Sequence, residues 1–219
     1  MATRMTTPEI NDGHSSGLES DGLKGAADPG FASVQQAPVN KGVLGLLMFI
    51  GAEVMFFGGL ISVFLILRAN SQTWPPAGQP MLPLVVTLVN TVFLLASGFT
   101  MNRAMRASRA DLSMTMTKWL IATAGLGATF LLIQGSEWVR LIRFGLTLTS
   151  STYGGIFYAL IGCHGLHVAG AMVFLLIVLK KSLARTYSTR SDTLAELCGL
   201  YWYFVVAIWP VLFVLVYLS

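Results

Sequence analysis

Residues 43–67 read VLGLLMFIGAEVMFFGGLISVFLIL, and Glu53 is the only ionisable residue among them. An α-helix rises 1.5 Å per residue, so a helical run of this length crosses the roughly 30 Å hydrocarbon core of a bilayer. The stretch therefore predicts a transmembrane helix that carries one carboxyl group into the membrane.

Four more apolar runs of similar length follow, and they cover residues 82–101, 119–139, 154–179 and 197–218. The chain of 219 residues is 54% hydrophobic and only 11% charged, against about 25% charged residues in an average soluble domain. This composition excludes a soluble globular protein and a disordered one. We expect an all-α polytopic membrane protein, a bundle of five transmembrane helices.

The segment before the first run has a different composition. Residues 1–41 are dominated by Gly, Ser, Ala, Asp and Pro and contain few large apolar side chains. Such a segment cannot bury enough surface to offset its ordering entropy. We expect a flexible cytoplasmic tail over residues 1–41, without a cleavable secretory signal, and one membrane domain over residues 42–219.

Basic residues set the expected orientation, because Lys and Arg accumulate in the cytoplasmic loops of membrane proteins. With the tail in the cytoplasm, eleven of the 14 Lys and Arg residues fall on the inner side. Only Arg68, Arg140 and Arg143 then lie outside. The pattern predicts an amino terminus inside and a carboxyl terminus outside. The basic residues form no continuous stripe, so no nucleic-acid partner is expected.

Three ionisable side chains lie deep within the expected spans. At 1.5 Å per residue, Glu53 lies about 16 Å from the inner end of its helix, and His164 and His167 lie about 16 and 21 Å from the outer end of theirs. A carboxylate at that depth should be protonated, paired or hydrated. Two interpretations stay open, a proton-exchanging or lipid-headgroup site and a protonated acid that hydrogen-bonds a neighbouring helix. His164, at nearly the same depth, is the expected partner.

The two histidines stand at positions i and i+3 of one helix, a spacing that invites a metal or haem hypothesis. The supply of ligands argues against it. The only other histidine, His14, lies in the tail, and Cys163 and Cys198 belong to no CxxC motif. Zinc takes four ligands, and a haem–copper centre needs more imidazoles than this chain contains. We therefore expect no metal on this chain and inter-helix hydrogen bonds from the histidines.

Other polar and aromatic residues lie where helices meet or leave the membrane. Glu137 ends the third run near the outer interface, where pairing with Arg140 or Arg143 is expected. Asn90 can hydrogen-bond a neighbouring helix. Trp74, in the loop after the first run, fits an interfacial aromatic belt.

Small residues predict where helices pack closely. They are Ala96, Ser97 and Gly98 in the second run, and Gly165 and Ala169, spaced as small-xxx-small, in the fourth. Glu196 opens the fifth run on the inner side, where the positive end of the helix dipole favours an acidic group.

Read in order, these segments resemble subunit III of the haem–copper terminal oxidases. Residues 47–57, LMFIGAEVMFF, are similar to the third helix of that family, whose SEVLFF stretch bears an intramembrane glutamate. The other matching segments are WPPAG at 74–78, LVNT at 88–91, LLASG at 94–98, QGSEW at 134–138, YGGIFY at 153–158, GCHGLHV at 162–168 and YWYFV at 201–205 followed by Trp209. The resemblance runs from about residue 41 to the end of the chain.

The chain departs from the family pattern in two ways. Mitochondrial-type members have seven spans, and this chain lacks the first two, which help to form a lipid-filled cleft in the larger members. Tyr203 and Val206 stand where the family usually shows histidine and aspartate. Five-span members occur among quinol-oxidase subunits III and among subunit III-like proteins linked to nitric oxide reductase.

The resemblance implies an accessory, non-redox subunit of a respiratory oxidase that reduces oxygen to water and pumps protons. It implies a multi-pass protein of the inner (plasma) membrane, with oxidase subunits I and II and membrane lipids as partners. Haem and copper belong to the partner subunits, and a bound phospholipid is compatible with the family. The implied role is to support the stability and proton uptake of subunit I.

The candidate site residues fall into two groups. The intramembrane group, which has a proton-relay or structural role, consists of Glu53, His164 and His167. The second group consists of the interface or lipid-contact candidates Trp74, Asn90, Glu137 and Trp202.

The alternative functions are those of a subunit III-like protein associated with nitric oxide reductase and of a small membrane transporter. An enzyme in its own right is not favoured, because no nucleophile, base and orienting group occur together.

Overall fold

The computed structural model describes residues 41–72, 74, 84–145, 147, 149, 151–184 and 192–218. The predicted tail lies outside these residues, except for Lys41, which begins the first helix. Most of the WPPAG loop also lies outside them, so Trp74 is its only described residue.

The described segments form five α-helices and no strands. Their bounds are Lys41–Ala69 for α1, Leu84–Arg109 for α2, Ser113–Arg143 for α3, Thr152–Leu183 for α4 and Asp192–Tyr217 for α5. Each helix is long and apolar enough to cross a membrane. The prediction of an all-α bundle with five transmembrane helices is therefore confirmed.

Several helices extend beyond the apolar runs that predicted them. α3 begins six residues before position 119, and α4 continues four residues past position 179. The added turns carry charged side chains such as Lys118, Lys180 and Lys181. Hydrophobicity marks only the part of a helix that lies in hydrocarbon, whereas backbone hydrogen bonding continues into the interface.

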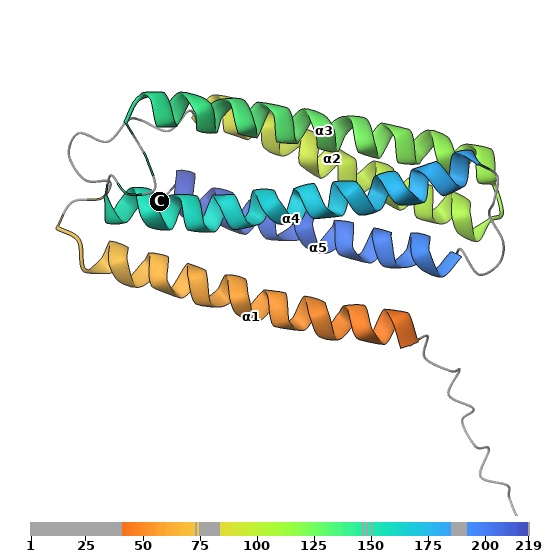
Figure 1. Cartoon of the computed structure of the whole chain (residues 1–219), viewed down its shortest axis with the longest axis horizontal. Coiled ribbons are helices and arrows are strands. Elements are labelled where there is room, and N and C mark those ends of the chain that lie inside the picture. Colours follow the sequence, from red (N-terminus) through yellow and green to blue (C-terminus); the bar gives the residue numbers. More distant parts are fainter. Residues whose placement is uncertain are drawn as a thin grey trace, which may run out of the picture. The chain divides into compact units, whose positions relative to one another are not determined.

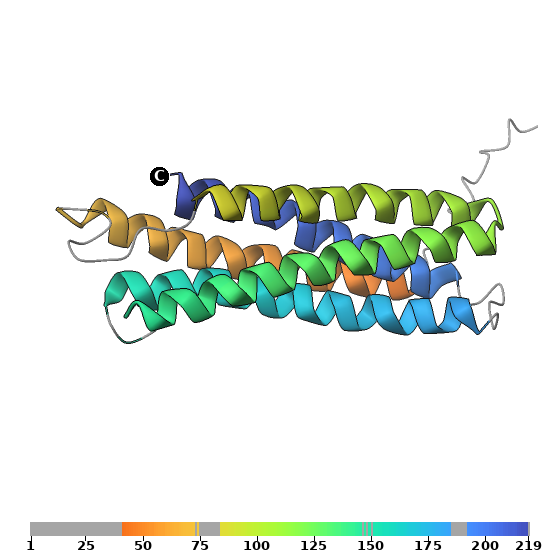
Figure 2. The same cartoon turned by 90° about the horizontal axis from the view of Figure 1, so that it is seen from above.

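The helices run along a common direction (Figures 1 and 2), and α1 lies at one edge in the view of Figure 1. α2 and α3 form the most extensive pair, and α5 packs on α1, α2 and α4. Only three residues separate α2 from α3, and Asp111 adopts a φ of 53°, a left-handed conformation that Asp tolerates better than most residues. Among the described residues, α1 contacts α4 and α5 but neither α2 nor α3.

Small residues allow close approach between the helices, as the sequence predicts. A Cβ atom at Gly98 would lie 3.2 Å from Val206 Cγ1 of α5, and one at Gly165 would lie 2.6 Å from Trp138 Cη2 of α3. These two glycines therefore mark the α2–α5 and α3–α4 contacts, where a larger residue would force the helices apart.

Tryptophan side chains of α5 fill the middle of the bundle. Trp202 and Trp209 are fully buried, and each donates its indole N–H to a hydroxyl of α2. The distances are 3.1 Å from Trp202 Nε1 to Ser97 Oγ and 2.9 Å from Trp209 Nε1 to Thr91 Oγ1. An indole N–H without an acceptor would be costly in this apolar interior, so the two bonds fix the position of α5 against α2.

Candidate functional site: a carboxyl–imidazole pair between α1 and α4

Glu53 of α1 and His167 of α4 form a hydrogen bond inside the apolar part of the bundle. Glu53 Oε2 lies 2.9 Å from His167 Nε2, and the two side chains are only 17% and 16% exposed. On its other side the imidazole contacts its own helix, with 2.6 Å between His167 Nδ1 and the Cys163 carbonyl oxygen. Both ring nitrogens are therefore engaged, which fixes the orientation of the ring.

The contact with Cys163 also determines which nitrogen carries hydrogen. A carbonyl oxygen can only accept, so His167 Nδ1 must be the protonated donor. The neutral ring then presents an unprotonated Nε2 to Glu53. One proton is shared across the 2.9 Å contact, either as a carboxylic acid that donates to imidazole or as a carboxylate that accepts from imidazolium.

Aromatic rings surround the pair on the α1 side. Phe57 meets the His167 ring edge-on, with the ring centroids 5.1 Å apart, and it is fully buried. Phe56 lies further away, at 6.4 Å between centroids. These rings keep the polarity of the surroundings low, which strengthens the hydrogen bond and makes an unpaired charge unfavourable.

His164 does not bond to Glu53, and the expected Glu53–His164 hydrogen bond is wrong. His164 is 1% exposed and stacks on Trp209 of α5, with ring centroids 4.9 Å apart. It also meets Phe130 of α3 edge-on at 6.3 Å. The two histidines differ in direction by only about 60° around α4, but this is enough to turn His167 toward α1 and His164 toward α5 and α3.

Asn90 forms the predicted bond between helices. Its Nδ2 donates to the Phe130 carbonyl oxygen of α3 at 3.2 Å and lies 3.5 Å from Gln134 Oε1. Asn90 and Trp202 are both fully buried, so within this chain they contact other helices of the same bundle. The hydrogen bond between Trp209 and Thr91 belongs to the same core. The sequence did not predict this bond, although Trp209 belongs to the family motif that begins with YWYFV.

Two further candidates, Glu137 and Trp74, lie toward the end of the bundle where α1 and α3 end. Glu137 is buried and accepts a hydrogen bond from Arg140 Nη1 at 2.9 Å, so the predicted pairing is confirmed. Trp74 packs edge-on between Phe64 of α1 and Tyr153 of α4, with ring centroids 5.4 and 5.0 Å apart. Trp74 therefore links α1 to α4 a second time, well away from Glu53.

No three His, Cys, Asp or Glu side chains come together in the described part of the chain in a way that could hold a metal ion. Cys163 and Cys198 are free thiols. The side chains of Glu53, Asn90, Thr91 and Ser97 instead make hydrogen bonds between helices.

Five apolar helices and a partly buried carboxyl–imidazole pair define a multi-pass membrane protein with an ionisable contact between two of its helices. The sequence matches the family model described as Cytochrome c oxidase subunit III over residues 26–219, and the chain belongs to this family. The family provides an accessory subunit of haem–copper oxidases and holds no redox centre itself. The resemblance seen in the sequence motifs is thereby confirmed.

Bacterial relatives support the same assignment. The chain is 37% identical to cytochrome c oxidase subunit 3 of Synechocystis sp. over 202 residues, which cover 92% of this chain and 85% of the relative. The corresponding subunit of Thermostichus vulcanus is 34% identical over 177 residues, 80% of this chain and 86% of the relative. A probable cytochrome c oxidase subunit 3 of Mycobacterium leprae is 33% identical, with coverages of 80% and 86%. These relatives do not favour the nitric oxide reductase or transporter alternatives.

Proposed function

We propose that this chain is subunit III of an oxidase in the inner (plasma) membrane, with its amino terminus in the cytoplasm. It contacts subunits I and II, which hold haem and copper, and it binds membrane phospholipid. Family membership supports the partnership, and the excess of basic residues on one side supports the orientation.

Within that complex, the Glu53–His167 pair holds α1 on the rest of the subunit. α1 has only two buried side chains, Phe57 and Phe64, so apolar packing contributes little to its attachment. A polar contact between membrane helices is worth about 0.6 kcal/mol on average and at most about 1.7 kcal/mol. For a helix with so little buried surface, that contribution decides how firmly it stays in place. The 2.9 Å bond between Glu53 and His167 is the observation that carries this proposal.

A second role, proton relay toward subunit I, is favoured by the single proton that the pair shares. Glu53 and His167 are both partly exposed on the surface of this chain, which leaves room for a proton-donating group of a partner subunit to approach. The structural and relay roles differ in what they require: hydrogen bonding suffices for the first, whereas the second needs a group that releases a proton.

Substitution of Glu53 separates the two roles. Glu53→Gln keeps a donor for His167 Nε2 but cannot exchange a proton, and Glu53→Ala removes both abilities. In the purified oxidase we expect Glu53→Gln to retain subunit III and most oxygen reduction, while Glu53→Ala loses subunit III during detergent exchange. Ser62→Ala is the matched control, because Ser62 lies on α1 and its hydroxyl donates only to Gly58 of the same helix.

The measurements are the amount of subunit III per haem and the rate of proton uptake. Slower proton uptake in both Glu53 variants would establish the relay role. A defect in Glu53→Ala alone would establish the structural role. If both variants keep subunit III and turn over for as long as the wild type, the pair has neither role.

A further inference from the structure

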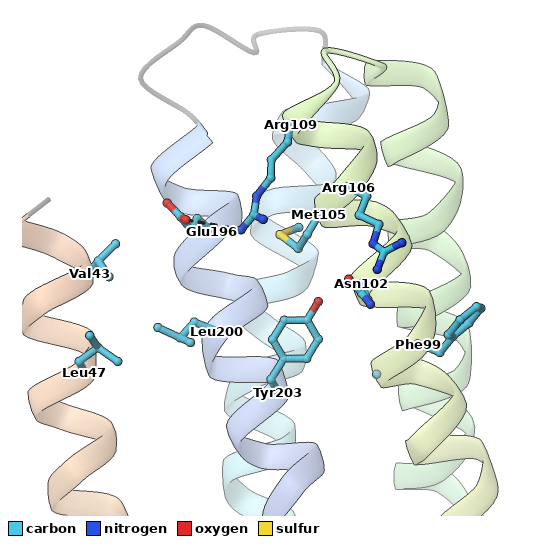
Figure 3. Close-up of a pocket in the computed structure, with 11 residues that line it drawn as sticks. Val43, Leu47, Phe99, Asn102, Met105, Arg106, Arg109, Glu196, Leu200 and Tyr203 are labelled. Atoms are coloured by element: carbon cyan, nitrogen blue, oxygen red, sulfur yellow. Dashed lines mark ion pairs between the residues drawn. The ribbon is translucent and has the colours of Figure 1, made fainter. Parts of the chain in front are cut away.

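A groove lies between α1 and α2 at the end of the bundle where α1 begins and α2 ends. Its volume is about 830 Å³. Among the described residues α1 and α2 do not touch, and α5, which packs on both, forms the floor. The first half of α1 is therefore one wall of the groove, without direct support from the opposite wall. Figure 3 shows the lining side chains, among them Val43 and Leu47 of α1, Asn102 and Arg106 of α2, and Leu200 and Tyr203 of α5.

The two halves of α1 differ in how they are attached to the bundle. Residues 41–56 contribute no side chain to the hydrophobic core of the described chain or to the shell of side chains packed against it. Trp74 holds the second half in addition, because it packs edge-on against Phe64 and Tyr153. The α1 side chains that belong to the core or pack against it are Phe57, Leu60, Ile61, Phe64 and Leu67. Apolar packing thus anchors α1 only from Phe57 onward.

The first half of α1 is held by ring contacts and by a hydrogen bond. The ring centroids of Phe49 and Tyr201 lie 6.1 Å apart, and those of Phe56 and His167 lie 6.4 Å apart. Both distances are in the upper part of the range of about 4.5–7 Å for ring pairs. The hydrogen bond between Glu53 and His167, at 2.9 Å, is much closer. This bond is therefore the contact that best fixes the first half of α1.

Gly58 and Gly59 lie at the junction between the two halves. Each glycine is less favourable in a helix than alanine by about 1 kcal/mol, and a Cβ atom at either position would meet nothing within 4 Å. Close packing therefore does not require glycine at this point. The Ser62 hydroxyl also donates to the Gly58 carbonyl oxygen at 2.8 Å, and such bonds to residue i−4 often bend helices. Because glycine and serine pairs are a recognised cause of helix kinks, this turn offers the least resistance to bending.

We propose that residues 41–56 form a hinged arm, which swings about Gly58 and Gly59 and thereby sets the width of the groove that leads to Arg106. The hydrogen bond between Glu53 and His167 is the latch that holds the arm on α4. This inference rests on the attachment role proposed above for that pair.

The geometry gives the size of the movement. Val43 lies 15 residues before Gly58, or about 22 Å along the helix, so a bend of about 10° moves it by about 4 Å. Two carbon atoms in contact are about 3.5–4.0 Å apart. The swing is therefore large enough to admit or exclude one layer of atoms between the two walls of the groove.

Distances between spin labels, measured by double electron–electron resonance, test the proposal on the full-length chain in phosphatidylcholine nanodiscs. One label pair, Met48→Cys with Arg103→Cys, spans the groove end of α1 and α2, and the other, Ile66→Cys with Val85→Cys, spans their opposite ends. All four side chains are exposed. Cys163→Ser and Cys198→Ala remove the native thiols and keep the Cys163 carbonyl that His167 contacts.

The wild type should show a broader distance distribution for the 48–103 pair than for the 66–85 pair. Gly58→Ala combined with Gly59→Ala should narrow the 48–103 distribution, because alanine stiffens the helix without touching a neighbour. Gly45→Ala is the matched control, since its Cβ atom also meets nothing within 4 Å but lies away from the hinge. Glu53→Ala should shift the mean 48–103 distance by about 4 Å and leave the 66–85 distance unchanged.

Equal widths for the two label pairs in the wild type would overturn the hinge, as would a 48–103 width that the two alanines at the hinge leave unaltered. An equal shift of both pairs in Glu53→Ala would also overturn it, because α1 would then move as a rigid rod, but the attachment role of Glu53 would stand. No shift at either pair would overturn the latch and the attachment role together. If Glu53→Ala does not fold, the alanine pair at the hinge still decides the proposal.

Discussion

A methyl group added at Gly127 tests how tightly α5 is held at the centre of the bundle. A Cβ atom there would lie 2.6 Å from Met172 Cε and 2.7 Å from Trp202 Cη2, whereas carbon atoms in contact are normally about 3.5–4.0 Å apart. The end of Met172 can move aside, because its side chain is flexible. The Trp202 indole is 1% exposed and is bonded to Ser97, so it cannot move without breaking that bond.

The expected effect of Gly127→Ala combines three contributions. Overpacking a core costs about 1–3 kcal/mol, and loss of the Trp202–Ser97 hydrogen bond costs about 1 kcal/mol more. Alanine is favoured over glycine within a helix by about 1 kcal/mol, which offsets part of this loss. We therefore expect Gly127→Ala to lower the free energy of unfolding by about 1–3 kcal/mol.

Gly125 supplies a matched control on the same helix, two residues away. A Cβ atom at Gly125 meets nothing within 4 Å, so Gly125→Ala should leave stability unchanged or raise it by up to about 1 kcal/mol. Unfolding of the purified full-length chain in mixed micelles, followed by tryptophan fluorescence, measures both variants. Wild-type stability in Gly127→Ala would refute the close packing of α5, and an equal loss in both variants would show that packing is not the cause.

Two more predictions follow from the described contacts and the charge pattern. Thr91→Val should lower the free energy of unfolding by about 1–3 kcal/mol, because it leaves the buried Trp209 indole N–H without an acceptor. Trp209→Phe should cost more, because it also removes part of a buried ring, and the double variant should lose little more than Trp209→Phe alone; full additivity in a double-mutant cycle would contradict this. Reporter fusions at residue 75 and at residue 185 should give opposite signals, with residue 185 in the cytoplasm; equal signals would rule out the proposed topology.

The helices could be predicted from the sequence because hydrophobic length is a strong one-dimensional signal. Each of the five runs is long enough to span hydrocarbon as a helix, and a helix satisfies the backbone hydrogen bonds within its own segment. The pairing of Glu137 with Arg140 was also predictable, because residues at i and i+3 of one helix are always neighbours. Family motifs added the functional class, which the composition alone does not contain.

The partner of Glu53 could not be predicted in the same way. Depth counted along each helix places His164 level with Glu53, but it does not say how far either helix is tilted or rotated. One turn of α4 separates the two histidines, and rotation sends His167 toward α1 and His164 toward Trp209. Contacts between helices depend on packing around the whole circumference, which is information that a single sequence does not provide.

The groove between α1 and α2 was likewise absent from the sequence analysis. Arg106 and Tyr203 are 97 positions apart in the chain, Arg106 in the last turn of α2 and Tyr203 within α5. Only the packing of α5 beneath both α1 and α2 brings them to one space.

The most direct test of the central claim is purification of the tagged full-length chain from its native membranes in a mild detergent. The account predicts co-purification with subunits I and II, identified by peptide mass spectrometry, and a reduced-minus-oxidised haem spectrum. After separation of the subunits, iron and copper should remain with the partners. Recovery of the chain without a haem-bearing partner, or with stoichiometric iron or copper on the separated chain, would contradict its assignment as an accessory oxidase subunit.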